Sequence, residues 1–271
     1  MLDVINIRLS DPIGCTIIST GVLLSVRSAF PAAKINIYTK HPDLVSGTQG
    51  INSILDAALN GVDYHIDLTN YVETLRPFEL LPHRHLLIHQ FEIANQQINS
   101  RMHSSVQLHQ LFPELRFNTE ERSRALRTYD QLAKGKPLVW LQMKTSTKAK
   151  DWNEAGWREV RQLSSSCNFV NLQQYSVKDA IALAAICDAG VTLDTYALHG
   201  AAAVGAQNVI GLMISSPWEV VGYAGQKSVN GLSDDAAQQI ANILAEAVHE
   251  PDGRLARANR RRAFVDSYTW A

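Results

Sequence analysis

Cysteine is scarce in this sequence, and its placement argues against two kinds of stabilised domain. The chain holds only three cysteines, Cys15, Cys167 and Cys187, and no two of them stand in C-x-x-C spacing. A zinc site or a disulfide framework needs clustered or regularly paired cysteines. We therefore expect reduced thiols, as in a cytoplasmic protein.

The sequence also lacks a long apolar run and an excess of charge of either sign. No run approaches the ~20 apolar residues that a membrane-spanning helix needs. The N-terminal MLDVINIRLSD has no basic segment followed by a long apolar stretch, so we expect no signal peptide. The formal net charge is -1, whereas a general nucleic-acid binder carries a clear positive excess. These absences predict a cytoplasmic protein that does not bind nucleic acid.

Strand and helix signals alternate along the 271 residues, of which 46% are apolar and 19% charged. In the first half, strands are predicted at 4–9, 34–39, 54–59 and 65–69, with helices at 16–30 and near 42–45. In the second half, strands are predicted at 137–143, 168–174, 189–194 and 206–213, with helices at 153–166, 177–187, 196–205, 234–248 and 253–268. Such alternation indicates βαβ units and parallel sheets.

The break after the charged helix ERSRALRTYDQLAKGKP divides the two series. We predict a Rossmann-like domain over residues 1–135, a second over 136–250, and a C-terminal helix within 251–271 that packs back on the first domain. The predicted fold class is α/β, with two Rossmann-like domains facing one another across a cleft.

One candidate site lies in VTLDTYALHGAAAVGA, residues 191–206. A strand delivers Asp194 and Thr195 to its carboxyl end, and a helix begins at once. The free N–H groups of a helix N-terminus suit a phosphate, and His199, one turn further, can face the same side as Thr195. The alternative is that Asp194 and Thr195 only cap the helix, with His199 packed beneath the small residues.

A second candidate site lies in KTSTKAKDWNEAGWREV, residues 144–160. Hydroxyls, lysines and a helix N-terminus in one loop would suit a diphosphate, and Lys150 is the best placed residue to neutralise a departing phosphate. The alternative is a solvated charged loop. Trp152 and Trp157 are predicted to pack in the core. His83, His85 and His89 are interpreted as ordinary histidines, because no cysteine or acidic cluster accompanies them, so no metal site is predicted.

These segments together resemble glycosyltransferase family nine, the ADP-heptose:lipopolysaccharide heptosyltransferase family. KDWNEAGWREV is similar to the family's Lys-x-Trp-Pro-x-x-x-Trp stretch, and DTYALHGAAAVGA to its Asp-Thr-Gly-x-x-His-x-x-Ala-Ala-x-Gly. FVNLQQ resembles the strand that precedes the family's contact with the donor ribose. IRLSDPIGC, FPAAKINIYTK and DYHIDLT resemble its N-terminal strands. The resemblance covers most of the chain in order and is most specific in the C-terminal half.

The resemblance implies two domains in the GT-B arrangement, the first on the acceptor side and the second binding the nucleotide-sugar. It implies an inverting transferase of lipopolysaccharide biosynthesis that moves heptose from ADP-heptose to a hydroxyl acceptor, such as a cell-surface glycan precursor, without cofactor or metal. It also allows peripheral association with the inner membrane. The donor contacts that it implies are Thr145, Ser146, Lys150, Gln173 or Gln174, Asp194, Thr195, Tyr196 and His199.

The sequence departs from the family pattern at the expected catalytic base. The family has Gly-Asp after the first strand, where this chain has Gly14-Cys15 and a turn that is one residue longer. A thiol with a pKa near 8.5 is a poor base for a sugar hydroxyl, so Asp11 in the same turn is the preferred candidate and Cys15 the other. Tyr196 stands where the family has glycine.

Two other functions remain open at this point. The chain could bind a nucleotide-sugar without transferring it, as a sensor or assembly partner. It could also be a nucleotide-sugar epimerase or hydrolase, which needs no acceptor.

Overall fold

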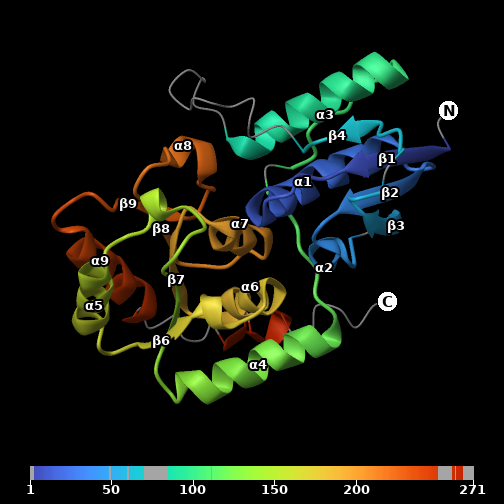
Figure 1. Cartoon of the computed structure of the whole chain (residues 1–271). Coiled ribbons are helices and arrows are strands. Elements are labelled where there is room, and N and C mark those ends of the chain that lie inside the picture. The colour runs from blue at the N-terminus through green and yellow to red at the C-terminus, as the bar shows by residue number, and fades with distance from the viewer. Residues whose placement is uncertain are drawn as a thin grey trace. The chain divides into compact units, whose positions relative to one another are not determined.

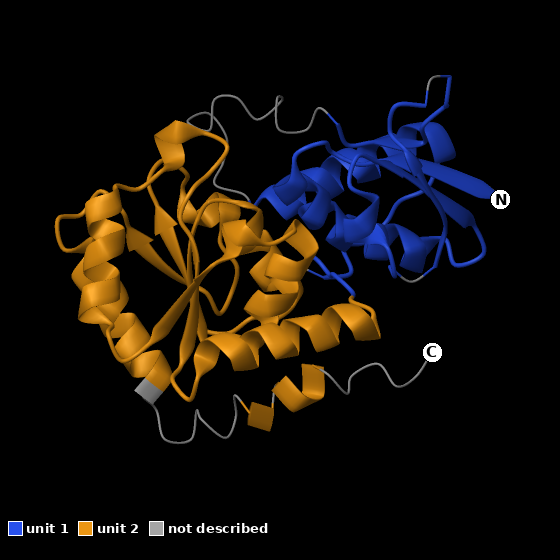
Figure 2. Cartoon of the chain, turned by 60° about the horizontal axis from the view of Figure 1, so that its bottom comes forward, with its two compact units in different colours: residues 1–116 blue, residues 117–271 orange. Residues whose placement is uncertain are grey.

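The structure is a computed structural model that describes residues 3–48, 50–59, 61–69, 85–110, 112–249, 258–259 and 261–264. The chain divides into two compact units, residues 1–116 and 117–271 (Figure 2). Each unit contains its own parallel sheet. The predicted α/β class with two Rossmann-like domains is therefore confirmed.

The first unit is built on a four-stranded sheet (Figure 1). Its elements are β1 (Val4–Arg8), α1 (Ile13–Ala29), β2 (Lys34–Thr39), α2 (Pro42–Val45), β3 (Ile51–Asp56), β4 (Ile66–Asp67) and α3 (Leu86–Met102). The strand order is β3-β2-β1-β4. The chain builds outward from β1 on one side and reaches β4 on the other. The direction in which strands are added to the sheet therefore reverses between β1 and β4. The turn after β1 carries Asp11.

The two faces of this sheet differ in polarity, because successive side chains of a strand point to opposite faces. One face is apolar and belongs to the core that includes residues of α1 and α3; its strand residues include Ile5, Ile7, Ile35 and Ile37, each at most 2% exposed. The alternate positions include the polar residues Asn6, Arg8 and Asn36. The Asn36 side-chain amide donates to Asn6 Oδ1 at 3.1 Å and accepts from Ser53 Oγ at 2.7 Å, which ties β1, β2 and β3 together.

The second unit is built on a five-stranded sheet. Its elements are α4 (Thr119–Ala133), β5 (Leu138–Gln142), the 3-10 turn η3 (Lys148–Lys150), α5 (Glu154–Leu163), β6 (Asn168–Asn171), the 3-10 turn η4 (Leu172–Gln174), α6 (Val177–Ile186), β7 (Ala189–Leu193), α7 (Tyr196–Ala203), β8 (Val209–Met213), α8 (Trp218–Val221), β9 (Lys227–Asn230) and α9 (Ala236–His249). All residues of β5, β7 and β8 are buried, as expected for central strands of a parallel sheet.

The strand order of this sheet is β6-β5-β7-β8-β9, with every pair parallel. From β5 the chain goes to β6 on one side and then crosses to β7 on the other. The direction of strand addition therefore reverses between β5 and β7. The carboxyl ends of all these strands lie at one edge of the sheet, and ligands of open parallel sheets bind outside such an edge at the reversal point.

The division between the units falls at 116/117, whereas the sequence predicted 135/136. The difference is α4, which is held to α6 by two ion pairs. Arg124 Nε lies 2.8 Å from Asp179 Oδ1, and Lys178 Nζ lies 3.0 Å from Glu121 Oε1. A break in the sequence pattern after α4 therefore does not mark the boundary, because tertiary packing groups α4 with the second unit.

Most of residues 251–271 lies outside the described residues. Within the described part, Arg261 Nη1 lies 3.2 Å from Asp188 Oδ1 and 3.0 Å from the Tyr129 hydroxyl. Phe264 also packs against Phe117, with ring centroids 5.8 Å apart. Phe117 and Tyr129 lie within residues 1–135, the domain on which the sequence predicted the C-terminal helix to pack, although both belong to the second compact unit, as Asp188 does.

Several bounds differ from the sequence prediction: the strand predicted over 65–69 is the two-residue β4, and the strand predicted over 168–174 ends at Asn171, after which η4 begins. The strand predicted over 54–59 is β3, which ends at Asp56, because the Asp56 carboxylate accepts the N–H of Ala58 at 2.9 Å and turns the chain. The sequence also missed α8 and β9, which have 4 residues each and are too short for a clear periodic signal.

Replacing Gly190 with alanine is expected to lower the free energy of unfolding by about 3 kcal/mol, the upper part of the usual range for overpacking. Gly190 on β7 is the register partner of Trp140 on β5, and a Cβ at this glycine would lie 1.8 Å from Trp140 Cε2. Trp140 is fully buried, so its ring has no space to move into. For a chain of this size the melting temperature should fall by roughly 6–12 °C, measured by circular dichroism.

The double variant Gly190→Ala, Trp140→Leu tests the cause of this loss. Removing the ring should make space for the added methyl group, so the two changes should destabilise less than the sum of their separate effects. An additive result, or a Gly190→Ala chain as stable as the unaltered one, would contradict the packing argument.

Candidate functional site

The candidate site lies at the carboxyl edge of the second sheet, where β5 and β7 end. The loop after β5 carries Lys150 at the last position of η3, and Asp194 follows β7 directly. These two side chains meet although they are 44 residues apart, with Lys150 Nζ donating to Asp194 Oδ2. A charged pair therefore stands at the point of the sheet where a ligand is expected.

Asp194 is the centre of this cluster. Its side chain is 10% exposed, against 31% for Lys150. The same oxygen that accepts from Lys150 also accepts from the hydroxyl of Ser216, which follows β8, and Asp194 Oδ1 lies 3.9 Å from His199 Nε2. Burial acts to raise the pKa of the Asp194 carboxyl, but Lys150, His199 and the two hydrogen bonds outweigh it, so this pKa lies below its ordinary value. Asp194 is therefore held as a carboxylate.

His199 is held from its other ring nitrogen. Its Nδ1 lies 3.0 Å from the Tyr223 hydroxyl, and the two rings pack edge to face with centroids 5.7 Å apart. The ring is buried on α7, whose small residues let this helix pack close to α6: a Cβ at Gly200 would lie 2.7 Å from Ile181. The imidazole therefore has a fixed orientation toward Asp194.

Only one of the two residues proposed as helix caps has that role. Thr195 is the N-cap of α7, and its hydroxyl accepts the N–H of Ala197 at 3.2 Å. Asp194 instead pairs with Lys150 across the sheet edge. The prediction of a helix cap is therefore correct for Thr195 only. Asp194 does not cap α7 and stays a candidate for binding or catalysis.

Tyr196, which stands where the family has glycine, is the first residue of α7. Its hydroxyl donates to Gln142 Oε1 at the end of β5, at 3.4 Å. Burial raises the pKa of this phenol to about 12, so it is a neutral donor at physiological pH. The ring thus spans the same pair of strands, β5 and β7, as Lys150 and Asp194.

The loop before α5 has an ordered backbone and exposed side chains. The backbone N–H of Thr145 donates to Asp151 Oδ1 at 2.8 Å, and Asp151 Oδ2 lies 3.7 Å from Lys144 Nζ. Thr145 is half-buried, whereas Ser146 is exposed. Asn153 caps α5 by accepting the N–H of Gly156 at 2.7 Å. Asp151 and the cap thus fix the loop that carries Lys150.

The predicted ribose contacts lie on the neighbouring strand. Gln173 and Gln174 form the end of η4, directly after β6, and both are exposed. Because β6 is next to β5, these side chains lie on the same edge of the sheet as the Lys150 loop.

Asp11 and Cys15 belong to the first unit, at the carboxyl end of β1. The turn is held by the buried Thr16 hydroxyl, which donates to the carbonyl of Ser10 at 2.7 Å. Asp11 Oδ2 accepts from Lys40 Nζ at 2.6 Å, while its Oδ1 has no hydrogen-bond partner among the described residues. Cys15 lies in the first turn of α1 and is half-buried, with its carbonyl accepting from Gln90 Nε2 at 3.1 Å.

Sequence reasoning missed Ser216 and Tyr223. Ser216 stands in a Ser-Pro pair after a strand, which is a recognisable turn after a strand end, but nothing in the pattern points to Asp194. Tyr223 follows α8, which the sequence did not predict. Both act through contacts 22 or 24 residues distant along the chain.

The described residues contain no group of three or more His, Cys, Asp or Glu side chains that could hold a metal ion. His85 caps α3 by accepting the N–H of Leu87 at 3.1 Å, and His83 lies outside the described residues. Among the described helices, none has both the length and the apolar character needed to cross a membrane.

The site combines one half-buried cation, Lys150, with buried groups that orient it. Lys150 can turn its remaining ammonium protons to an anion, and the N-terminus of α7 adds partial positive charge beside it. Asp194, Ser216, His199 and Tyr223 hold this arrangement from beneath. Such a site suits a phosphate group that gains negative charge as a bond to it breaks.

No protein-family model and no curated protein matches this chain. Solved structures share its fold. A glycosyl transferase of family 9 from Veillonella parvula has a TM-score of 0.71 at 13% identity, over 91% of this chain and 97% of that one. E. coli ADP-heptose lps heptosyltransferase II has a TM-score of 0.68 at 16% identity, over 92% and 98%.

E. coli heptosyltransferase WaaC, solved with ADP and with ADP-2-deoxy-2-fluoro heptose, has TM-scores of 0.63 and 0.62 at 13% identity, over 90% of this chain and 99% of that one. The resemblance seen in the sequence is therefore confirmed at the level of the fold. The chain has the α/β fold of GT-B type that these glycosyltransferases share.

Proposed function

We propose that this chain is an inverting glycosyltransferase that moves heptose from ADP-heptose to a hydroxyl acceptor, such as a precursor of a cell-surface glycan. The observation that carries the proposal is the Lys150–Asp194 pair at the reversal point of the second sheet, with His199 and the N-terminus of α7 beside it. The likeness in fold to heptosyltransferases, one of them solved with ADP, supports it.

In the proposed reaction, an acceptor oxygen forms a bond to the anomeric carbon as the bond from that carbon to the diphosphate breaks. ADP leaves with the bonding electrons, and its developing negative charge faces Lys150 and α7. The proton of the acceptor hydroxyl passes to a base, for which Asp11 is the candidate. Gln173 and Gln174 would contact the ribose, Thr145 and Ser146 the diphosphate. The reaction as proposed uses no metal and no cofactor.

A second candidate function is binding of the nucleotide-sugar without transfer, as a sensor or assembly partner. Cys15 at the position of the family's aspartate and the pairing of Asp11 with Lys40 favour it. The epimerase or hydrolase alternative has no observation of its own in its favour.

The proposed function carries two further expectations. A transferase that uses ADP-heptose for lipopolysaccharide synthesis would work in the cytoplasm, where the activated sugar is made. An acceptor of that kind would bring the protein to the inner membrane as a peripheral protein. Both follow from the proposed donor and acceptor.

The donor is tested by titration calorimetry of the unaltered chain with ADP-heptose, ADP, a UDP-sugar and a GDP-sugar. We expect ADP-heptose to bind most tightly, in the micromolar range of about -8 kcal/mol, and the UDP- and GDP-sugars at least tenfold more weakly. Tighter binding of a UDP- or GDP-sugar would replace the proposed donor. Binding of none of the four would remove the proposed function.

A further inference from the structure

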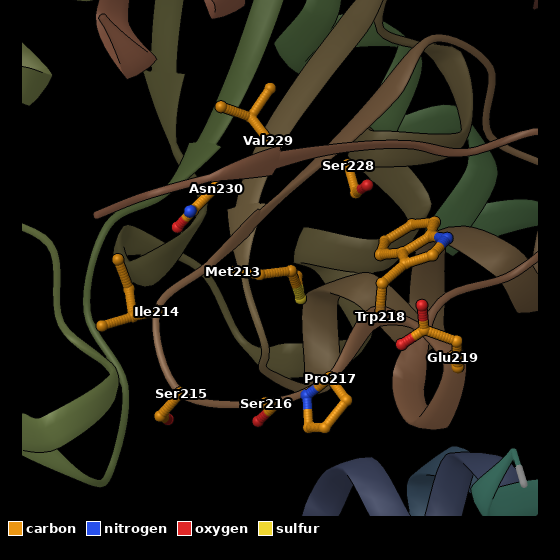
Figure 3. Close-up of a pocket in the computed structure, with 10 residues that line it drawn as sticks. All are labelled: Met213, Ile214, Ser215, Ser216, Pro217, Trp218, Glu219, Ser228, Val229 and Asn230. Carbon is orange, nitrogen blue, oxygen red and sulfur yellow. The ribbon is translucent and has the colours of Figure 1, made fainter. Parts of the chain in front are cut away.

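A cavity of about 350 Å³ opens at the carboxyl edge of the second sheet. It is lined by residues 213–219, which follow β8 and enter α8, and by residues 228–230 of β9 (Figure 3). β8 and β9 lie beyond β7 in the strand order, on the side opposite to β5 and β6. A ligand that has its phosphates between β5 and β7 could therefore reach this cavity with its other end.

Ser216 joins the cavity to the site already described. It is one of the cavity's lining residues, and its hydroxyl donates to Asp194, the partner of Lys150. The cavity therefore begins one hydrogen bond away from the charged pair that faces the proposed diphosphate.

The charges of the lining exclude an anionic group as the occupant. None of the lining residues is Lys, Arg or His, and the one charged residue is Glu219, which is exposed. A second phosphate would meet this carboxylate with no compensating cation. The occupant must instead be neutral or positively charged in the part that enters.

The polar groups of the lining can donate and accept hydrogen bonds on several sides. Asn230 uses Oδ1 to accept the N–H of Leu232 at 3.0 Å, which leaves its amide N–H groups for a ligand. Glu219 has no ion-pair partner within the described parts of the chain, and its carboxylate accepts hydrogen bonds only. Ser228 adds an exposed hydroxyl. This mixture of donors and acceptors matches the hydroxyl groups of a sugar.

The apolar part of the lining is a flat, fixed surface. Figure 3 shows the Trp218 ring and the Met213 side chain in the middle of the cavity residues, with Ser228 on one side and Ser216 on the other. The ring lies close over two glycines: a Cβ at Gly222 would lie 2.3 Å from Trp218 Cε2, and one at Gly211 would lie 2.7 Å from Cζ3. A rigid aromatic face packs well against the C–H face of a sugar ring.

We propose that this cavity binds the glycosyl group of the nucleotide-sugar donor, with Trp218 beneath the sugar and Glu219, Ser228 and Asn230 as partners of its hydroxyls. The inference rests on the proposed function, because it takes the diphosphate of the same donor to lie at Lys150. It makes residues 213–219 and 228–230 the part of the chain that selects the sugar.

The test compares ADP-heptose with ADP by titration calorimetry, because ADP lacks the sugar that the cavity is proposed to bind. Glu219→Gln keeps the shape of an exposed side chain and removes its charge; Ser228→Val fills the opposite side of the cavity with a residue suited to a strand. Each variant should weaken binding of ADP-heptose about tenfold, a loss of the size expected when one hydrogen bond to the sugar is removed. Binding of ADP should stay within about twofold of the unaltered chain.

Glu159→Gln is the matched control, since Glu159 is an exposed glutamate on α5 that does not line the cavity. It should leave both affinities unchanged. The inference would be overturned if both cavity variants bound ADP-heptose as tightly as the unaltered chain. In that case the site for ADP would stand. An unaltered chain that bound neither ligand would overturn the proposed function and this inference together.

Discussion

Replacing Lys150 with alanine is expected to lower the rate of glycosyl transfer from ADP-heptose by about 10²- to 10³-fold, the usual loss when one group that stabilises developing charge is removed. Lys150 is the cation of the candidate site, and its partner Asp194 is nearly buried. Without the ammonium group the departing diphosphate meets the Asp194 carboxylate, which then keeps His199 beside it. Rates with saturating donor, measured by release of ADP, give the size of the effect.

The double variant Lys150→Ala, Asp194→Asn separates two causes of the slower transfer: loss of the cation that stabilises the diphosphate, and repulsion of the diphosphate by the Asp194 carboxylate. Removing the carboxylate also removes its repulsion of the diphosphate, so the double variant should bind ADP more tightly than Lys150→Ala alone. It should still transfer slowly, because the stabilising charge is absent. Lys150→Arg, which keeps the charge, should retain more activity than either.

Lys136→Ala is the matched control for charge, because Lys136 is an exposed lysine just before β5, at the amino edge of the sheet. It should transfer at the rate of the unaltered chain. Thermal unfolding of each variant shows whether the fold is kept. A folded Lys150→Ala chain that transfers within about threefold of the unaltered rate would exclude Lys150 from charge stabilisation.

Replacing Asp11 with asparagine is expected to lower kcat by about 10²- to 10⁴-fold, the contribution typical of a positioned general base. Asparagine keeps the size of the side chain and cannot accept the proton of the acceptor hydroxyl. The Oδ1 atom of Asp11 has no hydrogen-bond partner within the described residues, whereas Oδ2 is bound to Lys40. The donor should bind as before, since its contacts are proposed on the second unit.

Three further variants test whether the loss of activity in Asp11→Asn is due to loss of the general base. Lys40→Gln removes the ion pair and keeps the carboxylate, so it should change kcat far less than Asp11→Asn. Asp43→Asn changes an exposed aspartate on α2 and should have no effect. Cys15→Ala should also be active. An active Asp11→Asn chain with an inactive Cys15→Ala chain would assign the base to Cys15, and a chain that binds the donor but transfers to no acceptor would favour the binding function.

Local signals were enough to place most of the secondary structure. The strand over 34–39 and the short helix at 42–45 have the predicted bounds, because alternating apolar residues and a proline-started turn are properties of a few neighbouring residues. The strand predicted over 54–59 spans 51–56 instead, and its end was missed because a single side-chain hydrogen bond, from Ala58 N–H to Asp56, turns the chain there.

The candidate site was partly predictable for the same reason. Lys150 and Asp194 each follow a strand of a parallel sheet, and strand ends of such a sheet share an edge. Their contact could thus be expected from two separate local patterns. The motif resemblance also singled out His199, which the structure places 3.9 Å from Asp194.

The sequence by itself therefore determined the α/β class, the order of most elements and the edge at which the chemistry is expected, since each depends on hydrophobic period and on turn residues close in the chain. Only the tertiary structure decided that Ser216 and Tyr223 complete the cluster, that Trp140 requires Gly190, and that α4 joins the second unit. These are contacts between residues distant in the chain. They depend on how whole elements pack, which no local pattern records.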